Sequence, residues 1–159
     1  MQFEPIEQWI WLPDSLSAGH RTTLHTSMYG DAKKDGNYTV ARFTKSYRFG
    51  KPVASVHIRT SGDTFFRLCV NRQHRITGPA SVGGDFLSND RVRPQHYATE
   101  LTLNADEPGL AEGNLDFSAI VRMLPVRMFE FSQEHGGFFL TAHVRFTDGT
   151  KTVLLTDES

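Results

Sequence analysis

The stretch SGDTFFRLCVNRQHRITGPA, residues 61–80, decides the fold class of this chain. Phe66, Leu68 and Val70 occupy every second position, and this period of two is typical of a half-buried strand. The polar residues at 71–73 then supply a tight turn, and Ile76 resumes the apolar pattern before a Gly-Pro exit. The stretch therefore predicts a β-hairpin.

The same period of two runs through most of the other apolar segments. We expect further strands over residues 7–12, 38–49, 53–60, 115–125, 137–147 and 151–156, and one more that contains Tyr97, Leu101 and Leu103. In residues 38–49, Phe43, Tyr47 and Phe49 share an inner face, which Lys45 interrupts. The chain is thus strand-like almost throughout.

The connections between these strands are also readable. Asp148-Gly149 separates the last two strands and is a strong hairpin signal. Gly62-Asp63 is expected to turn the chain into the opening hairpin, and residues 106–110 to form one short helical turn. Residues 13–37 and 78–91 are expected to be long loops.

Together these elements predict an all-β protein, an antiparallel β-sandwich of the jelly-roll type, with less than about a fifth of its residues helical. The apolar positions that should form its core are Phe43, Tyr47, Val56, Ile58, Phe66, Leu68, Val121, Leu140 and Val144.

Composition sets limits on the class of function. The 159 residues correspond to one domain, and a net charge of −1 gives no basic footprint for nucleic acid. No segment has the roughly 20 consecutive apolar residues that span a bilayer, so we expect neither a membrane nor nucleic acid as a partner. Cys69 is the single cysteine, which excludes an internal disulfide. The first residues do not read as a secretory signal, and we expect a soluble protein with the cytoplasm as the favoured compartment.

Several motifs occur in a recognisable order. They are WIWLP at 9–13, RFTKSYRF at 42–49, the hairpin at 61–80, LAEGNLDFSAIV at 110–121 and GGFFLTAHVRFTDGT at 136–150. In this order they resemble the N-terminal β-sandwich module of bacterial α-L-rhamnosidase-like glycoside hydrolases. The sequence departs from the pattern at Arg72, where glycine is usual after Asn71, so we expect a different turn type there.

The resemblance implies a fold like that of the galactose-binding domain and a role as an accessory domain. Residues 1–159 would be a single β-sandwich excised from a larger glycosidase, with a catalytic domain downstream as partner. The accessory domain would support the catalytic domain. The ligand that the resemblance suggests is a rhamnose-containing carbohydrate. The alternative is a self-standing structural or protein-interaction β-sandwich without a sugar ligand.

We expect no catalytic residue in this chain, whatever its parent does. Inverting glycosidases place two carboxylates several ångströms apart, and no pair of acids here forms a motif. Asp106-Glu107 and Asp157-Glu158 lie in predicted loops or at the end of the chain, where acids are usually solvated.

The N-terminal tryptophans suggest a docking surface. Trp9 and Trp11 point the same way along a predicted strand, and with Leu12 they form our candidate contact for the partner domain. The alternatives are packing in the core and an aromatic platform for a sugar ring.

A second candidate site lies in the loop at residues 83–97. The residues expected to contact carbohydrate share polar or aromatic side chains next to glycines; they are Asp85, Phe86, Asn89, Asp90, Arg91 and Tyr97. Carboxylate and amide oxygens also suit calcium, so Ca²⁺ is the one cofactor that this loop suggests, and the resemblance points the same way. Ordinary turn formation is the alternative, since turns use the same residue types.

Overall fold

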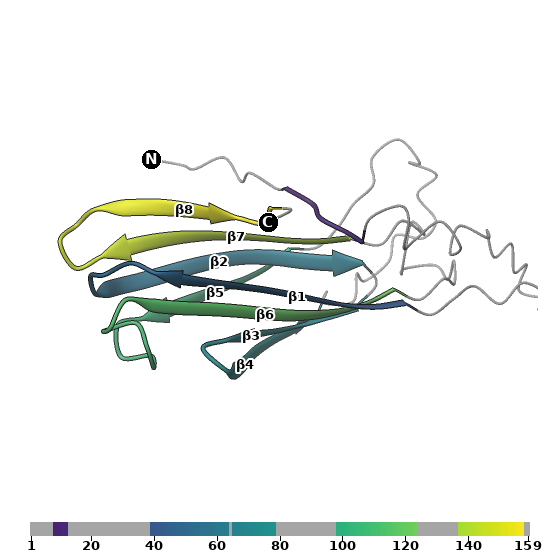
Figure 1. Ribbon diagram of the computed structural model, residues 1–159, viewed down its shortest axis with the longest axis horizontal. Helices are drawn as coiled ribbons and strands as arrows, with labels where there is room; N and C mark the ends of the chain where they lie inside the picture. The colour runs from purple at the N-terminus through teal and green to yellow at the C-terminus, as the bar shows by residue number, and fades with distance from the viewer. Residues whose placement is uncertain (1–7, 13–38, 64, 79–97, 124–136, 158–159) are drawn as a thin grey trace, which may run out of the picture.

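A computed structural model describes residues 8–12, 39–63, 65–78, 98–123 and 137–157, and these residues form two antiparallel four-stranded sheets without a helix (Figure 1). The strands are β1 (Thr39–Arg48), β2 (Val53–Asp63), β3 (Phe65–Val70), β4 (Gln73–Gly78), β5 (Thr99–Asn104), β6 (Asn114–Met123), β7 (Gly137–Phe146) and β8 (Lys151–Leu155). One sheet has the order β1-β6-β3-β4 and the other β5-β2-β7-β8. The predicted all-β antiparallel sandwich is confirmed.

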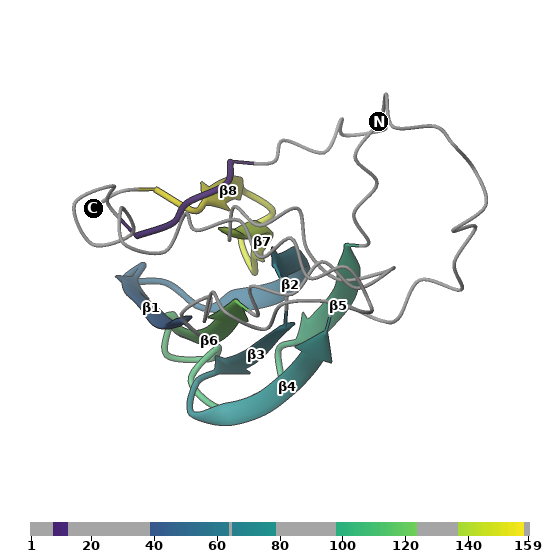
Figure 2. The same cartoon turned by 90° about the vertical axis from the view of Figure 1, so that its right-hand side faces the viewer.

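The chain changes sheet at most connections. Among the described strands, only β3–β4 and β7–β8 are hairpins within one sheet, and each other connection leads to the opposite sheet, as in jelly-roll sandwiches. Figure 2 shows the two sheets as curved layers, with β1 and β8 at one side and residues 8–12, in purple, between them. An antiparallel bridge from Ile10 to Phe138 fixes this N-terminal segment beside β7. One side of the sandwich is therefore bounded by two edge strands and the N-terminal segment.

The core lies between the sheets. Each strand contributes its alternate apolar side chains, because successive side chains point to opposite faces. Of the predicted core residues, all but Phe43 and Tyr47 are buried, and these two are half-buried and pack against the core. Both lie on β1, which is an edge strand, so the partner sheet covers them less completely.

The predicted hairpins are present, but the β3–β4 turn corrects one expectation. Asn71 and Arg72 have φ values of 47° and 66°, and two positive φ values are typical of the type I′ turn that Asn-Gly forms. The expectation that Arg72 would change the turn type is therefore wrong. Arg72 adopts the left-handed conformation that glycine usually has at this position. A register shift between Leu68 and Cys69 makes Arg75 an extra residue in β4.

Two other connections also differ from expectation. Residues 106–110 form consecutive turns rather than a helix: the N–H of Leu110 donates to Glu107 O, and the N–H of Gly113 donates to Leu110 O. Gly62 does not turn the chain, since β2 continues to Asp63 before the chain crosses to β3. Among the described residues there is no helix long and apolar enough to cross a membrane.

Candidate functional site

A cleft with a volume of about 540 Å³ lies between the two sheets, beside the edge strands β1 and β8. We call it the edge cleft. Its described lining comes from the N-terminal segment, from the five strands β1, β3, β6, β7 and β8, and from the residues that follow β8: Ile10, Trp11, Arg42, Phe43, Thr44, Lys45, Tyr47, Leu68, Phe117, Ala119, Phe138, Leu140, Leu155, Thr156 and Asp157. The cleft therefore opens at the side of the sandwich where each sheet ends in an edge strand, β1 in one sheet and β8 in the other.

The floor of the edge cleft is apolar and buried. Leu68, Phe117 and Ala119 come from one sheet, and Phe138 and Leu140 come from the other. Their exposed fractions are 0%, 8%, 2%, 3% and 5%. The floor is thus part of the hydrophobic core and offers no side-chain hydrogen bond.

Aromatic rings above the floor pack against the two phenylalanines of the floor. Phe43 and Phe138 stack across the two sheets with ring centroids 5.6 Å apart and an interplanar angle of 7°. Trp11 lies 6.3 Å from Phe43, and Tyr47 meets Phe117 edge to face at 6.3 Å. These distances lie within the range in which aromatic pairs attract one another, so the rings fix one another in place.

The rim of the cleft carries charge. Lys45 Nζ lies 3.3 Å from Asp157 Oδ1, and the two side chains are 37% and 47% exposed. Lys45 therefore interrupts the apolar face of β1 at the point where that face reaches solvent. The ammonium group reaches across the side of the sandwich to the carboxylate that follows β8.

Two hydroxyl groups accompany this ion pair. The Thr156 hydroxyl donates to Gln8 O and accepts from the N–H of Leu140 at 3.3 Å. Burial raises the pKa of Tyr47, the charge of Asp157 raises it further, and Lys45 opposes both effects. Since the pKa lies above its usual value near 10, the phenol keeps its proton at neutral pH and can donate a hydrogen bond.

This arrangement is suited to binding. An apolar interior with a few convergent polar groups is the usual composition of small-molecule sites, and about 540 Å³ lies within their ordinary range. Among the described lining residues, Asp157 carries the one carboxylate, so these residues do not assemble the carboxylate pair of a glycosidase. The cleft offers ring faces, hydroxyls and one ion pair for recognition.

The N-terminal residues predicted to dock a partner domain have separate surroundings. Trp9 packs edge to face on Phe139 with centroids 4.9 Å apart and is 39% exposed, whereas Trp11 lines the cleft beside Phe43. Leu12 is half-buried. The two tryptophans thus contact different rings instead of forming the shared platform that their spacing suggested.

The other predicted site falls outside the described residues. It comprises Asp85, Phe86, Asn89, Asp90, Arg91 and Tyr97, and nothing in the structure tests their role. Within the described part of the chain, no group of three or more His, Cys, Asp or Glu side chains could hold a metal ion. The calcium prediction therefore stays a prediction about that loop.

Sequence reasoning missed the polar half of the edge cleft. The sequence predicts a solvated surface position for Asp157, and the structure places it at the rim, exposed but paired with Lys45. The interrupted face of β1 was a usable signal, because a lysine within an apolar face needs a nearby route to solvent. That Asp157 is the partner of Lys45 could not be predicted from the sequence, since the two residues are 112 positions apart.

Comparison with known proteins shows likeness in fold alone. The sequence matches no protein-family model and no curated protein. A solved lectin from Pleurotus ostreatus, in its apo form, is similar with a TM-score of 0.57 and 15% identity, over 94% of this chain and 32% of that chain. An α-L-rhamnosidase from Dictyoglumus thermophilum is similar with a TM-score of 0.54 and 14% identity, over 75% of this chain and 12% of that chain. This chain therefore spans about a third of the lectin chain and about an eighth of the rhamnosidase chain.

Proposed function

We propose that this chain is a non-catalytic, carbohydrate-binding β-sandwich, the accessory domain of an α-L-rhamnosidase-like glycoside hydrolase. The order of the sequence motifs and the fold shared with part of a rhamnosidase chain support the parent enzyme. The observation that carries the binding role is the edge cleft, in which aromatic rings stand next to hydroxyl and charged groups.

The chemistry of the rim matches that of a sugar. A pyranose presents hydroxyls around its ring and C–H groups on its face, so it needs hydrogen-bonding groups beside an aromatic ring. Tyr47 and Thr156 supply hydroxyls, and Lys45 and Asp157 supply a charged donor and a charged acceptor. Trp11 is the half-buried ring of the N-terminal segment and supplies the face.

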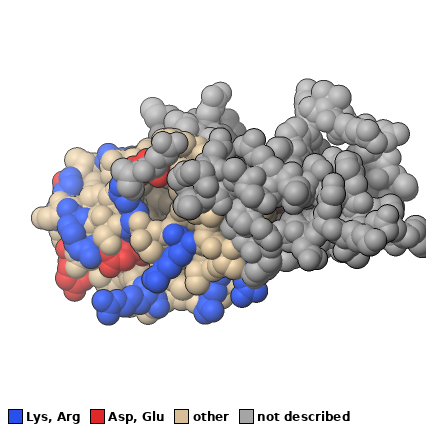
Figure 3. All heavy atoms as spheres, turned by 45° about the vertical axis from the view of Figure 1, so that its right-hand side comes forward, with Lys and Arg blue, Asp and Glu red and all other residues tan. Residues whose placement is uncertain are grey.

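The charge of the described surface agrees with a neutral ligand. Figure 3 shows one face of the molecule, and basic and acidic side chains lie near one another on its described part. The chain as a whole has a net charge of −1. A neutral sugar fits such a surface better than a strongly anionic polymer does, because long-range attraction requires a field of one sign.

Two parts of the proposal lie at other places on the chain. A second location for sugar, with or without calcium, is the segment at residues 83–97, which the sequence predicts to be a loop and which contains the acids Asp85 and Asp90. The partner is the downstream catalytic domain, which would dock on Trp9 and Leu12, with Trp11 shared between docking and the cleft. A partly exposed Trp9 is compatible with such a contact, since tryptophan is enriched at interfaces.

Isothermal titration calorimetry with methyl α-L-rhamnopyranoside tests the proposal. A matched pair of substitutions separates the two locations: Tyr47→Phe removes the hydroxyl from the edge cleft, and Tyr97→Phe makes the same change in the loop. We expect weak binding that Tyr47→Phe lowers about fivefold, because one hydrogen bond contributes about 1 kcal/mol net. Tyr97→Phe should leave the affinity unchanged.

Two results would count against this assignment. If Tyr97→Phe and the double change Asp85→Ala with Asp90→Ala remove the heat while Tyr47→Phe does not, the sugar binds at the loop instead. If the unaltered chain binds neither this glycoside nor other neutral sugars, the chain is a structural or protein-interaction β-sandwich.

A further inference from the structure

We infer that the edge cleft is selective for an amphipathic glycoside, one whose sugar carries an apolar substituent such as an aryl group. This inference rests on the proposed function, since it names the class of carbohydrate that the same site takes. It follows from how polarity is distributed with depth in the cleft.

The cleft changes from charged to apolar between its rim and its floor. At the rim, Lys45 and Asp157 are 37% and 47% exposed. Tyr47 and Phe43 are half-buried, and Leu68 at the floor is 0% exposed. Every described lining residue that is buried is apolar, so the polar side chains of the described lining belong to half-buried or exposed residues.

A bare sugar matches only the upper part of such a cleft. A hydroxyl pushed against the floor would lose its hydrogen bonds to water without replacement, and this costs roughly 1–3 kcal/mol for each group. The floor is lined by Leu68, Phe138 and Leu140, none of which has a polar side-chain atom. A sugar ring is therefore favoured at the rim and disfavoured at the floor.

An apolar substituent matches the remaining volume. A cleft of about 540 Å³ is large enough for a molecule of more than one ring, since pockets for drug-sized ligands occupy roughly 300–1,000 Å³. An aryl group below the sugar would contact the stacked rings of Phe43 and Phe138 and the side chain of Leu140. Burying it gains hydrophobic free energy, which the sugar alone cannot supply.

Two glycosides that differ only in their substituent test this inference. We would titrate the whole chain with phenyl α-L-rhamnopyranoside, with methyl α-L-rhamnopyranoside and with phenol, by calorimetry. We expect the phenyl glycoside to bind at least tenfold more tightly than the methyl glycoside, and more tightly than phenol. Saturation-transfer NMR on the unaltered chain should give its strongest signals on the phenyl protons, because these lie deepest.

A matched pair of substitutions at two phenylalanines supplies the structural control. Phe43 on β1 lines the cleft, whereas Phe65 on β3 is 36% exposed and does not line it. Phe43→Leu removes one of the two stacked rings and should reduce the preference for the phenyl glycoside at least threefold, and Phe65→Leu should leave it unchanged. If Phe43→Leu does not fold, Phe43→Met makes a change of the same kind, and the NMR experiment needs no variant.

The possible results separate this inference from the proposed function. Equal affinity for the two glycosides overturns the inference and leaves carbohydrate binding intact. Phenol that binds as tightly as the phenyl glycoside also overturns it, because the sugar then contributes nothing. Absence of binding by both glycosides contradicts the proposed function, and the inference falls with it.

Discussion

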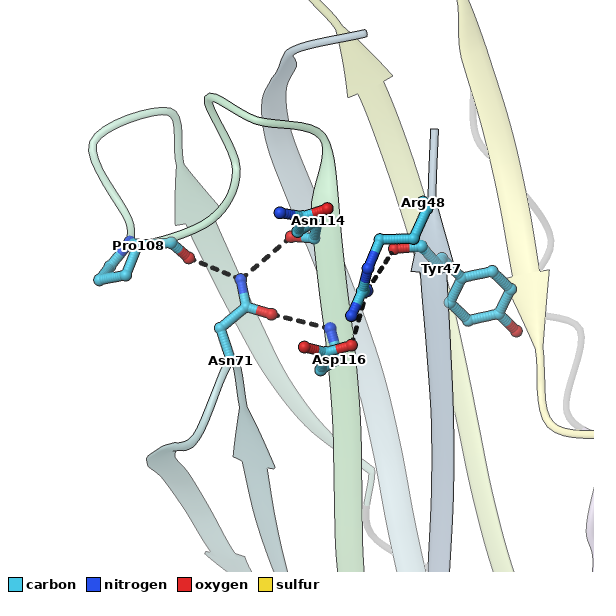
Figure 4. A network of polar contacts seen from close by, with 6 residues as sticks. All are labelled: Tyr47, Arg48, Asn71, Pro108, Asn114 and Asp116. Atoms are coloured by element: carbon cyan, nitrogen blue, oxygen red, sulfur yellow. Dashed lines mark hydrogen bonds and ion pairs between the residues drawn. The ribbon is translucent and has the colours of Figure 1, made fainter. Parts of the chain in front are cut away.

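Asn71 in the β3–β4 turn holds the backbone of Asp116 in β6 from two sides. Its side-chain Oδ1 accepts the N–H of Asp116 at 2.7 Å (Figure 4), as the dashed line shows. Its own N–H donates to Asp116 O at 2.9 Å. Its Nδ2 donates to Pro108 O at 2.6 Å and to Asn114 O at 3.1 Å. One asparagine side chain thus joins the hairpin to its neighbouring strand and to the turns before that strand.

The Asn71 contacts predict a graded loss of stability. Asn71→Gly keeps the positive φ but removes three side-chain hydrogen bonds, and we expect a loss of about 2 kcal/mol because each net bond contributes about 0.5–1.5 kcal/mol. Asn71→Ala should lose about 1 kcal/mol more, since alanine also disfavours a φ of 47°. Urea unfolding measures both. A glycine variant as stable as the unaltered chain would show that these bonds contribute little.

Replacing Arg72 with glycine should increase the stability of the chain. Its φ of 66° lies in the left-handed region, which costs a non-glycine residue roughly 1 kcal/mol. Its side chain is exposed, so few contacts are lost on removal. Arg72→Gly should therefore raise the free energy of unfolding by about 0.5–1 kcal/mol, and Arg72→Ala should not. A lower melting temperature for the glycine variant would contradict this explanation.

Any side chain at Gly78, at the end of β4, should clash with the core. A Cβ atom there would lie 2.9 Å from Cε1 of Phe66, whose ring is buried in the core. Gly78→Ala should therefore destabilise the chain by about 1–3 kcal/mol, the usual cost of overpacking. Phe66→Leu makes room at the same place, so the double variant should lose less than the sum of the two single changes. Simple additivity in urea unfolding would rule out the steric explanation.

The ionised carboxylate of Asp148 should stabilise the folded chain, and this stabilisation should be lost in acid. Hydrogen bonds from the Thr150 side chain, then from Lys51 and the Thr150 N–H, lower the pKa of Asp148 from its ordinary value near 3.8 to about 2. A lowered folded-state pKa means that this contribution is fully present above pH 4 and is lost as the pH falls toward 2. NMR titration of the Asp148 carboxyl carbon should give a midpoint near 2.

The Asp148→Asn variant is the matched control for this titration. It keeps an oxygen that can accept the Thr150 N–H but carries no titrating group. Its stability should fall less steeply between pH 4 and 2 than that of the unaltered chain. A midpoint near 3.8, or parallel acid limbs for the two proteins, would show that the bonds around Asp148 do not favour its charged form.

The hairpins were readable from sequence because their information is local. Alternation of side chains and the Asp148-Gly149 pair fix β7 and β8 within a short stretch of chain. The surroundings of Glu107 could not be predicted in this way. Its sequence context predicts solvated surface, whereas in the structure Glu107 is half-buried in a bidentate pair with Arg75. That pair depends on the extra residue in β4 and on the turns after β5, which no local pattern brings together.

The edge cleft could not be predicted for a related reason. It requires β1 and β8 to be the edge strands on the same side of the sandwich, and sheet order is a long-range property. The half-burial of Phe43 and Tyr47 follows from that order, although their place on the inner face was readable from the alternation alone.

The central claim, that the edge cleft binds carbohydrate, is tested most directly by NMR. In a titration with methyl α-L-rhamnopyranoside, the backbone amide shifts that change most should be those of Lys45, Tyr47, Thr156 and Asp157, which surround the rim. Residues on the opposite edge strands, β4 and β5, should not respond. Saturable shifts confined to the rim are the predicted result. Shifts confined to residues 83–97, or no saturable shift, would contradict the claim.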